Sequence, residues 1–143
     1  MPAGVREFIS FRFLRKAEAF TMTEGQYFTS EGECKVIGDT VTVTVDRPLG
    51  SYHPEHPGLY YPINYGYIKG TMASDGEEED AYILGIRKPV KEYTGKVIAV
   101  IHRKDDIEHK WVVAPDGSAF TAEEIRTAVH FQEQYFQSVI SFE

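Results

Sequence analysis

The sequence is poor in cysteine, with Cys34 alone among 143 residues. One cysteine cannot form a disulfide within the chain, so we expect a reducing, cytoplasmic location. No apolar run reaches the length of a membrane-spanning helix. The N-terminal region alternates aromatic residues with arginines and lacks the uninterrupted apolar stretch of a secretory signal. We therefore expect neither secretion nor a membrane partner.

Positive charge is also scarce, because 15 lysines and arginines face 22 aspartates and glutamates, for a formal net charge of −7. An acidic chain is a poor general partner for nucleic acid or an anionic membrane. The glycine-rich signatures of nucleotide loops and the serine signature of hydrolases are missing as well. His53-Pro54-Glu55-His56 resembles a zinc motif, but its prolines prevent the helix that such a motif needs.

What the chain does contain is an ordinary globular composition, 42% hydrophobic and 26% charged. This length suits one domain with a sizeable core. Residues 1–34 are rich in aromatic residues of irregular spacing, and we interpret them as an N-terminal extension of unknown role. Residues 35–143 form the main domain.

The main domain has the pattern of several short strands followed by one helix. Strict alternation from Thr40 to Val45 predicts a half-buried strand, and an aromatic strand follows from Leu59 to Ile68. Residues 97–114 predict a β-hairpin with a charged turn at Asp105 and Asp106. A capping box at Thr121 opens an amphipathic helix of about four turns, up to Phe136. The order indicates a mainly β fold, a small barrel with a C-terminal helix against it.

The most informative stretch is acidic, Asp75-Gly76-Glu77-Glu78-Glu79-Asp80. Carboxylates that converge on one point repel each other unless a cation lies between them, and oxygen ligands of this kind suit Mg²⁺. A solvated acidic turn is the alternative interpretation. A second acidic group, Asp105 to Glu108, lies next to Lys110, and the two groups together favour a site for more than one metal ion.

Two further features accompany the acidic groups. The segment Tyr60-Tyr61-Pro62-Ile63-Asn64-Tyr65-Gly66-Tyr67 offers phenolic donors, although buried tyrosines often serve only as core. Lys110 lies two residues from Glu108 on an expected strand, so both side chains would share a face. A lysine beside a metal cluster is a natural partner for a phosphoryl oxygen.

Taken together, these motifs closely resemble the soluble, Mg²⁺-dependent family I inorganic pyrophosphatases, which carry a tyrosine strand followed by an acidic metal loop. The resemblance runs from about Val41 to Tyr135. It implies an OB-like, five-stranded β-barrel flanked by a helix, and it makes residues 35–143 a pyrophosphatase-like domain. The implied activity is hydrolysis of inorganic pyrophosphate to two phosphates by a metal-activated water. The implied cofactor is Mg²⁺, with Mn²⁺ as a substitute.

The same resemblance assigns roles to individual residues. It implies a metal-binding set of Asp75, Glu77, Asp80, Asp105 and Glu108. Glu77, Lys110 and Tyr65 are the expected catalytic residues, with Glu77 at the water-activating position. Tyr135, Arg47 and Lys110 are the expected substrate-binding residues. The implied partner is pyrophosphate or a related small phosphoanhydride, and a homo-oligomer is compatible with the sequence.

The chain also departs from the family pattern. Glu77 and Glu108 stand where the family has aspartates, and Phe136 stands where it has a phosphate-binding lysine. The segment around Asp46 and Arg47 matches two different family segments, which leaves open whether Asp46 or Arg47 faces the site. An alternative is therefore a divergent relative that binds a metal–phosphate ligand, or hydrolyses another phosphoanhydride, with little pyrophosphatase activity. A different class of function, stacking of single-stranded nucleic acid on the tyrosines, is opposed by the negative charge.

Overall fold

A computed structural model describes residues 36–73, 76–104 and 109–142 of the chain. The N-terminal extension therefore lies outside the described residues, as do Asp75, Asp105 and Glu108. In the described part, no helix is long and apolar enough to cross a membrane.

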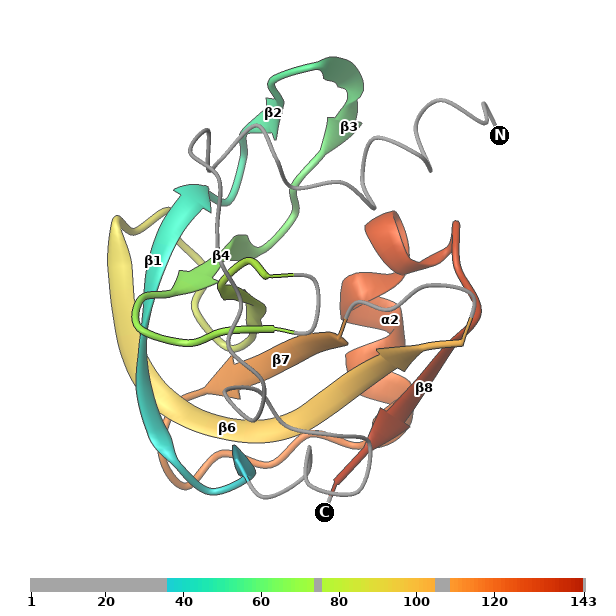
Figure 1. Cartoon of the computed structure of the whole chain (residues 1–143). Coiled ribbons are helices and arrows are strands. Elements are labelled where there is room, and N and C mark those ends of the chain that lie inside the picture. Colours follow the sequence, from blue (N-terminus) through green and yellow to red (C-terminus); the bar gives the residue numbers. More distant parts are fainter. Residues whose placement is uncertain (1–35, 74–75, 105–108, 143) are drawn as a thin grey trace.

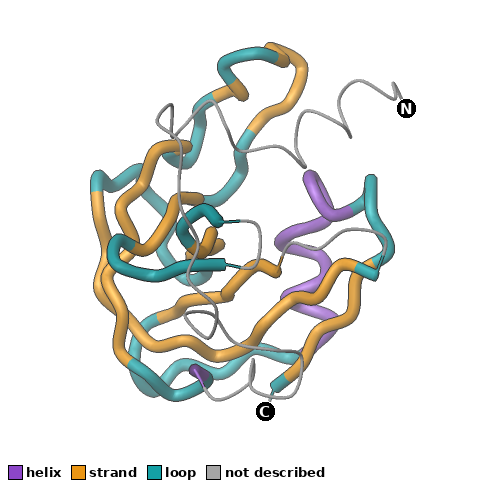
Figure 2. Tube along the Cα trace, in the orientation of Figure 1, coloured by secondary structure: helices purple, strands orange, loops and turns teal. Residues whose placement is uncertain are grey.

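The described residues contain eight strands and one α-helix, joined by turns and loops (Figures 1 and 2). The strands are β1 (Thr40–Arg47), β2 (Tyr52–His53), β3 (His56–Tyr60), β4 (Asn64–Ile68), β5 (Glu79–Ile83), β6 (Glu92–Arg103), β7 (His109–Ala114) and β8 (Ser138–Ser141), and the helix is α2 (Ala122–Glu133). The main sheet has the order β1-β4-β5-β7-β6-β8, and an additional pairing of β1 with β6 closes five of its strands into a barrel. The mainly β barrel with a C-terminal helix is thus confirmed.

Two hydrophobic clusters lie on the two faces of the barrel wall. One draws residues from all five barrel strands and fills the interior: Val43, Ile68, Ala81, Ile83, Val97, Val100, Trp111 and Val113. The other lies between the outer face of the barrel and α2, which contributes Ile125 and Val129. Successive strand residues point to opposite faces, so each buried strand serves both clusters. This explains why β5 and most of β7 are buried without alternation.

The helix begins as the sequence predicts. Thr121 Oγ1 accepts from the Glu124 amide at 3.1 Å, and Glu124 Oε1 accepts from the Thr121 amide at 2.8 Å. This capping box satisfies two of the amides that the first turn leaves open. The predicted length was wrong, because α2 has 12 residues, just over three turns, and ends at Glu133. Phe136 is buried beyond the helix end, and the chain then forms β8, which the sequence did not predict.

The proline-rich segment after β1 runs from Pro48 to Gly58. It includes β2 and most of β3, which pair as a short hairpin that projects from the barrel (Figure 1). Pro62 lies between two strands, since β3 ends at Tyr60 and β4 begins at Asn64. The predicted hairpin over residues 97–114 is confirmed by the antiparallel pairing of β6 with β7.

Candidate active site

The centre of the site is a buried contact among Asp80, Lys110 and Tyr65. Strands β5 and β7 run parallel, and their register pairs Asp80 directly with Lys110. Strand β4 pairs antiparallel with β5 so that Tyr65 opposes Tyr82, and its ring reaches diagonally to Asp80. These three residues lie on the outer face of the barrel, on the side that α2 covers.

The three side chains form a closed hydrogen-bonded group. Lys110 Nζ lies 2.8 Å from Asp80 Oδ2 and 3.0 Å from the Tyr65 hydroxyl oxygen. The Tyr65 hydroxyl donates to Asp80 Oδ2 at 2.7 Å. The side chains of Lys110 and Asp80 are fully buried, so each charge needs the other to offset its loss of water. The arrangement fixes an ammonium group, a phenol and a carboxylate within contact of one another.

Tyr61 extends the site toward β1. Its ring lies 5.7 Å from that of Tyr65, and burial raises the pKa of its phenol above the usual value. Tyr65 and Asp46 raise this pKa further, whereas the positive charges of Arg47 and Lys110 oppose the rise. Both Asp46 and Arg47 therefore lie close enough to Tyr61 to act on it electrostatically.

A β-bulge explains how two successive residues of β1 reach the same neighbourhood. The pairing of β1 with β4 shifts between Val45 and Arg47, at Asp46. A bulge re-aims side chains that a regular strand would send to opposite faces. Arg47 Nη1 also lies 3.2 Å from Asp46 Oδ2. Asp46 and Arg47 thus lie next to each other at the bulge, and which of them faces the site stays a prediction.

A second polar cluster links β6 to the end of α2. Arg103 Nε and Nη2 donate to Glu133 Oε1 and Oε2 at 3.1 and 2.8 Å. The Tyr82 hydroxyl donates to Glu133 Oε2 at 2.6 Å, and the Gln132 amide nitrogen donates to the Tyr82 oxygen at 2.8 Å. The Tyr61 hydroxyl donates to Gln132 Oε1 at 3.0 Å, which connects this cluster with the site.

The charges of this cluster explain two pKa shifts. Burial alone would raise the pKa of Glu133, but the positive charge of Arg103 and the hydrogen bonds from Arg103, Tyr82 and Ser138 lower it overall. Burial and the Glu133 carboxylate raise the pKa of Tyr82 well above its usual value. Glu133 is therefore an anion and Tyr82 a neutral donor at neutral pH.

Sequence reasoning did not single out Arg103, Gln132, Glu133 or Tyr82. A signal was present for Arg103, which continues the alternate buried positions of β6 beyond Ile101. For Gln132 and Glu133, the signal was their place on the apolar side of the helix, next to Val129. A charged residue on such a face needs a buried partner of opposite sign.

Of the other predicted site residues, two belong to the described part of the chain and three do not. Glu77 is half-buried in the turn before β5, where its carbonyl accepts from the Ala73 amide at 2.7 Å. Tyr135 is half-buried just after α2 and packs against the cluster that α2 covers. Asp75, Asp105 and Glu108, three of the five predicted metal ligands, lie outside the described residues. Within the described residues, no three histidine, cysteine or acidic side chains are placed to hold a metal ion.

The fold and site define a closed five-stranded β-barrel that carries a buried carboxylate, lysine and tyrosine on its outer face. The sequence model of the family described as inorganic pyrophosphatase matches residues 30–142. The chain therefore belongs to the inorganic pyrophosphatase family.

Individual relatives agree with this assignment. An inorganic pyrophosphatase of Rhodospirillum rubrum is 33% identical over 61 residues, which cover 41% of this chain and 34% of the relative. One from Haemophilus ducreyi is 29% identical over 93 residues, which cover 50% of this chain and 53% of the relative. The chain thus spans about a third to a half of the length of these relatives.

Solved structures agree on the fold. The crystal structure of inorganic pyrophosphatase from Ehrlichia chaffeensis superposes with a TM-score of 0.55 at 20% identity, covering 71% of this chain and 84% of that one. The structure of an inorganic pyrophosphatase from Coxiella burnetii gives 0.54 at 18% identity, covering 73% and 86%. The likeness supports the OB-like barrel that the resemblance implied.

Proposed function

We propose that the protein hydrolyses inorganic pyrophosphate to two phosphates in a Mg²⁺-dependent reaction. Family membership supports this activity, and the observation that carries it for this chain is the buried group of Asp80, Lys110 and Tyr65. Such a group presents an ammonium and a phenol where a phosphoryl oxygen could bind, next to a carboxylate. A related small phosphoanhydride is the natural alternative substrate.

The donor set of the proposed metal site fits Mg²⁺. Its members, Asp75, Glu77, Asp80, Asp105 and Glu108, offer only carboxylate oxygens, which suit hard divalent ions such as Mg²⁺ or Mn²⁺. Glu77 and Asp80 belong to the described residues and lie close together in sequence at the start of β5. When bound, the ions would lower the pKa of water and balance the negative charge of the phosphoryl groups.

Individual side chains of this chain would then have separate roles in the reaction. Glu77 would accept a proton from the attacking water, since a half-buried carboxylate is a suitable general base. Lys110 and Tyr65 would donate to the phosphoryl oxygens as negative charge develops on the leaving phosphate. Arg47 and Tyr135 would hold the outer part of the substrate. Because Lys110 Nζ is already held by Asp80 and Tyr65, its position is set before the substrate arrives.

The acidic net charge supports the absence of a nucleic-acid partner and of a membrane partner, and the single cysteine supports a cytoplasmic location. A homo-oligomer remains compatible with them.

The test is phosphate release from pyrophosphate by purified, folded protein with Mg²⁺, with Mn²⁺ and with EDTA. We expect release with either metal ion and none with EDTA. Glu77→Gln should lower kcat by about 10²–10⁴-fold, the usual contribution of a general base. Glu78→Gln, one residue away, is the matched control. Tight binding of Mg–pyrophosphate without turnover would instead identify the divergent binding protein, and neither binding nor turnover would refute both.

A further inference from the structure

Arg103 is a buried cation beside the candidate site that the proposed reaction does not yet use. It is the last residue of β6 and only 4% exposed. Strand β6 pairs with β7 so that Ile101 opposes Lys110. Arg103 lies two residues beyond Ile101, so Arg103 and Lys110 project from the same face of neighbouring strands.

The guanidinium of Arg103 is held in one orientation. Its Nε and Nη2 both donate to Glu133, which fixes the plane of the group. The ring of Phe136 covers one of its faces, with the guanidinium carbon 3.8 Å from the ring centroid. A bidentate contact and a stacked ring together leave an arginine little rotamer freedom.

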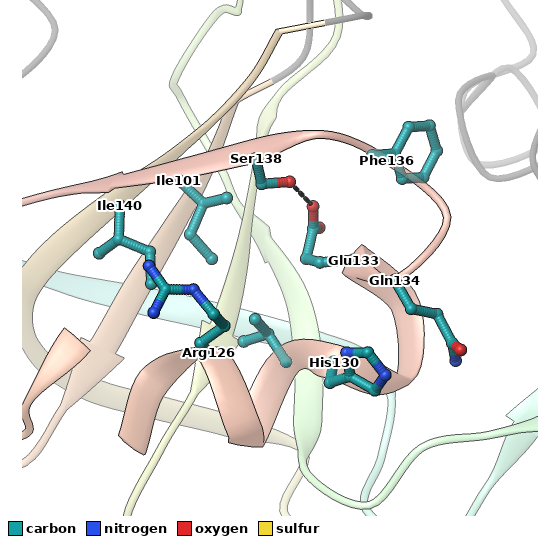
Figure 3. A pocket seen from close by; sticks show the side chains of 9 residues that line it. Ile101, Arg126, His130, Glu133, Gln134, Phe136, Ser138 and Ile140 are labelled. Carbon is teal, nitrogen blue, oxygen red and sulfur yellow. Dashed lines mark hydrogen bonds between the residues drawn. The ribbon is translucent and has the colours of Figure 1, made fainter. Parts of the chain in front are cut away.

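Glu133 is held in turn by its own partners. Ser138 Oγ donates to Oε1 at 2.7 Å, as Figure 3 shows, and the Tyr82 hydroxyl donates to Oε2. The Tyr82 ring lies 5.0 Å from that of Tyr65, which contacts Lys110. The fixed guanidinium and the fixed ammonium therefore belong to one continuous cluster.

Resting on the proposed function, we propose that Arg103 is a further substrate-binding residue, whose guanidinium binds a phosphoryl oxygen of pyrophosphate alongside Lys110. Glu133 is the positioning residue that holds Arg103. Pyrophosphate carries several negative charges, and Lys110 and Arg103 are two fixed cations of this cluster, each held by a carboxylate at 2.8 Å. A planar guanidinium is the side chain best matched to phosphate oxygens, and a fixed one binds at a smaller entropic cost.

The other interpretation of this ion pair is purely structural, a clamp between β6 and the end of α2. Truncating Arg103 alone would leave Glu133 as an unpaired buried charge and destabilise the fold under either interpretation. The double variant Arg103→Gln with Glu133→Gln avoids this, because both charges go together. Arg103→Lys provides a second variant that keeps the charge but loses the bidentate geometry.

A matched control is available on the surface. Arg126 is exposed on α2 and lines the pocket of about 230 Å³ between α2 and β8 that Glu133 also borders (Figure 3). Arg126→Gln removes the same charge from the chain without touching Arg103 or Lys110. It therefore reports any long-range effect of net charge.

The experiment measures the Kd of imidodiphosphate, a non-hydrolysable analogue of pyrophosphate, with Mg²⁺ by calorimetry, and the KM and kcat for pyrophosphate. Melting curves verify that each variant is folded. We expect the double variant and Arg103→Lys to weaken imidodiphosphate binding and raise KM by about 10- to 100-fold, as for a lost charge-assisted hydrogen bond. Arg126→Gln should change either value by less than about two-fold, the usual effect of a surface substitution.

Each outcome is decisive. Unchanged Kd and KM in a folded double variant would overturn the role of Arg103 and leave the proposed function standing. If the double variant does not fold, unchanged values in Arg103→Lys would do the same. Wild-type protein that binds imidodiphosphate but releases no phosphate would refute the proposed function, while the variants would still decide the role of Arg103 in binding. Wild-type protein that neither binds nor hydrolyses would overturn both.

Discussion

Lys110 and Asp80 form a fully buried ion pair, with Nζ of Lys110 2.8 Å from Oδ2 of Asp80, although 30 residues separate them in the sequence. The parallel register of β5 and β7 places them side by side. Strand pairing has thus brought Asp80 of the acidic run to Lys110, the lysine that follows the second acidic group in the sequence. Each charge stabilises the other, which offsets the loss of water around both groups.

The first prediction concerns the interdependence of this pair. Lys110→Met should lower the free energy of unfolding by about 3–5 kcal/mol, because it leaves Asp80 as an uncompensated buried charge. Adding Asp80→Asn should recover much of that loss without restoring pyrophosphate hydrolysis. Urea denaturation of both single variants and the double variant measures the coupling. Lys96→Met, at a half-buried lysine whose Nζ donates to the Gly38 carbonyl in an exposed hydrogen bond, should change stability by no more than about 0.5 kcal/mol. Additive effects of the two substitutions would contradict the prediction.

The second prediction isolates the phenol that joins the pair. Tyr65→Phe removes one donor to Asp80 and one acceptor for Lys110 but leaves their ion pair in place. We expect a loss of about 1–3 kcal/mol in stability. If the hydroxyl turns from Asp80 and donates to a phosphoryl oxygen in the transition state, kcat should fall by about 10²-fold or more. Tyr60→Phe, at a tyrosine that is 44% exposed, is the control for losing a phenol. A stability loss with unchanged kcat would show that Tyr65 serves the fold alone.

The third prediction is a pH dependence of stability that originates at His53. Burial, the charge of Arg47 and the neighbouring His56 lower the pKa of His53 from 6.5 to about 4. Between pH 4 and 6.5, His53 is neutral in the folded protein, whereas the same histidine in the unfolded chain binds a proton. The unfolded state then holds more protons, so stability rises with pH across this window and falls on acidification.

Substitution of His53 tests this assignment. Nδ1 of His53 accepts from the Glu55 amide at 3.0 Å, and His53→Asn offers an amide oxygen in a similar place. We expect the slope of unfolding free energy against pH between 4.5 and 6.5 to decrease in this variant. His130→Asn, at an exposed position of α2, should keep the wild-type slope. Equal slopes in both variants would assign the pH dependence to other groups.

The fourth prediction concerns the close approach of β1 and β4 at Gly66. A Cβ added to Gly66 would lie 1.9 Å from the backbone oxygen of Thr44, so Gly66→Ala must push the two strands apart. We expect a loss of stability of about 1–3 kcal/mol or more, together with reduced hydrolysis, because Tyr65 is the adjacent residue. A Cβ at Gly58 in β3 meets nothing within 4 Å, which makes Gly58→Ala the matched control. The melting temperatures of the two variants test this prediction. Similar values for Gly66→Ala and Gly58→Ala would contradict the close approach of β1 and β4.

Much of the architecture could be predicted because its signals are local. The alternation of β1 and the capping box of α2 are each contained within a few residues, and both are confirmed. Gln132 and Glu133 at the end of α2 show what local signals cannot predict. Their helical position indicates that Gln132 and Glu133 are buried, but nothing nearby indicates that Tyr82 and Arg103 are their partners.

By itself, the sequence determined the types of group available, namely an acidic run before a buried strand, a tyrosine strand and a lysine after the second acidic turn. It also determined the mainly β class, because side-chain alternation and capping depend on neighbours in the chain. Only the tertiary structure decided which groups meet. Closure of the barrel by β1 and β6, and the parallel pairing of β5 with β7, bring Asp80 to Lys110 and Tyr65. Such contacts depend on the register of strands that are distant in sequence. A register shift of one residue would move every side chain of a strand to the opposite face.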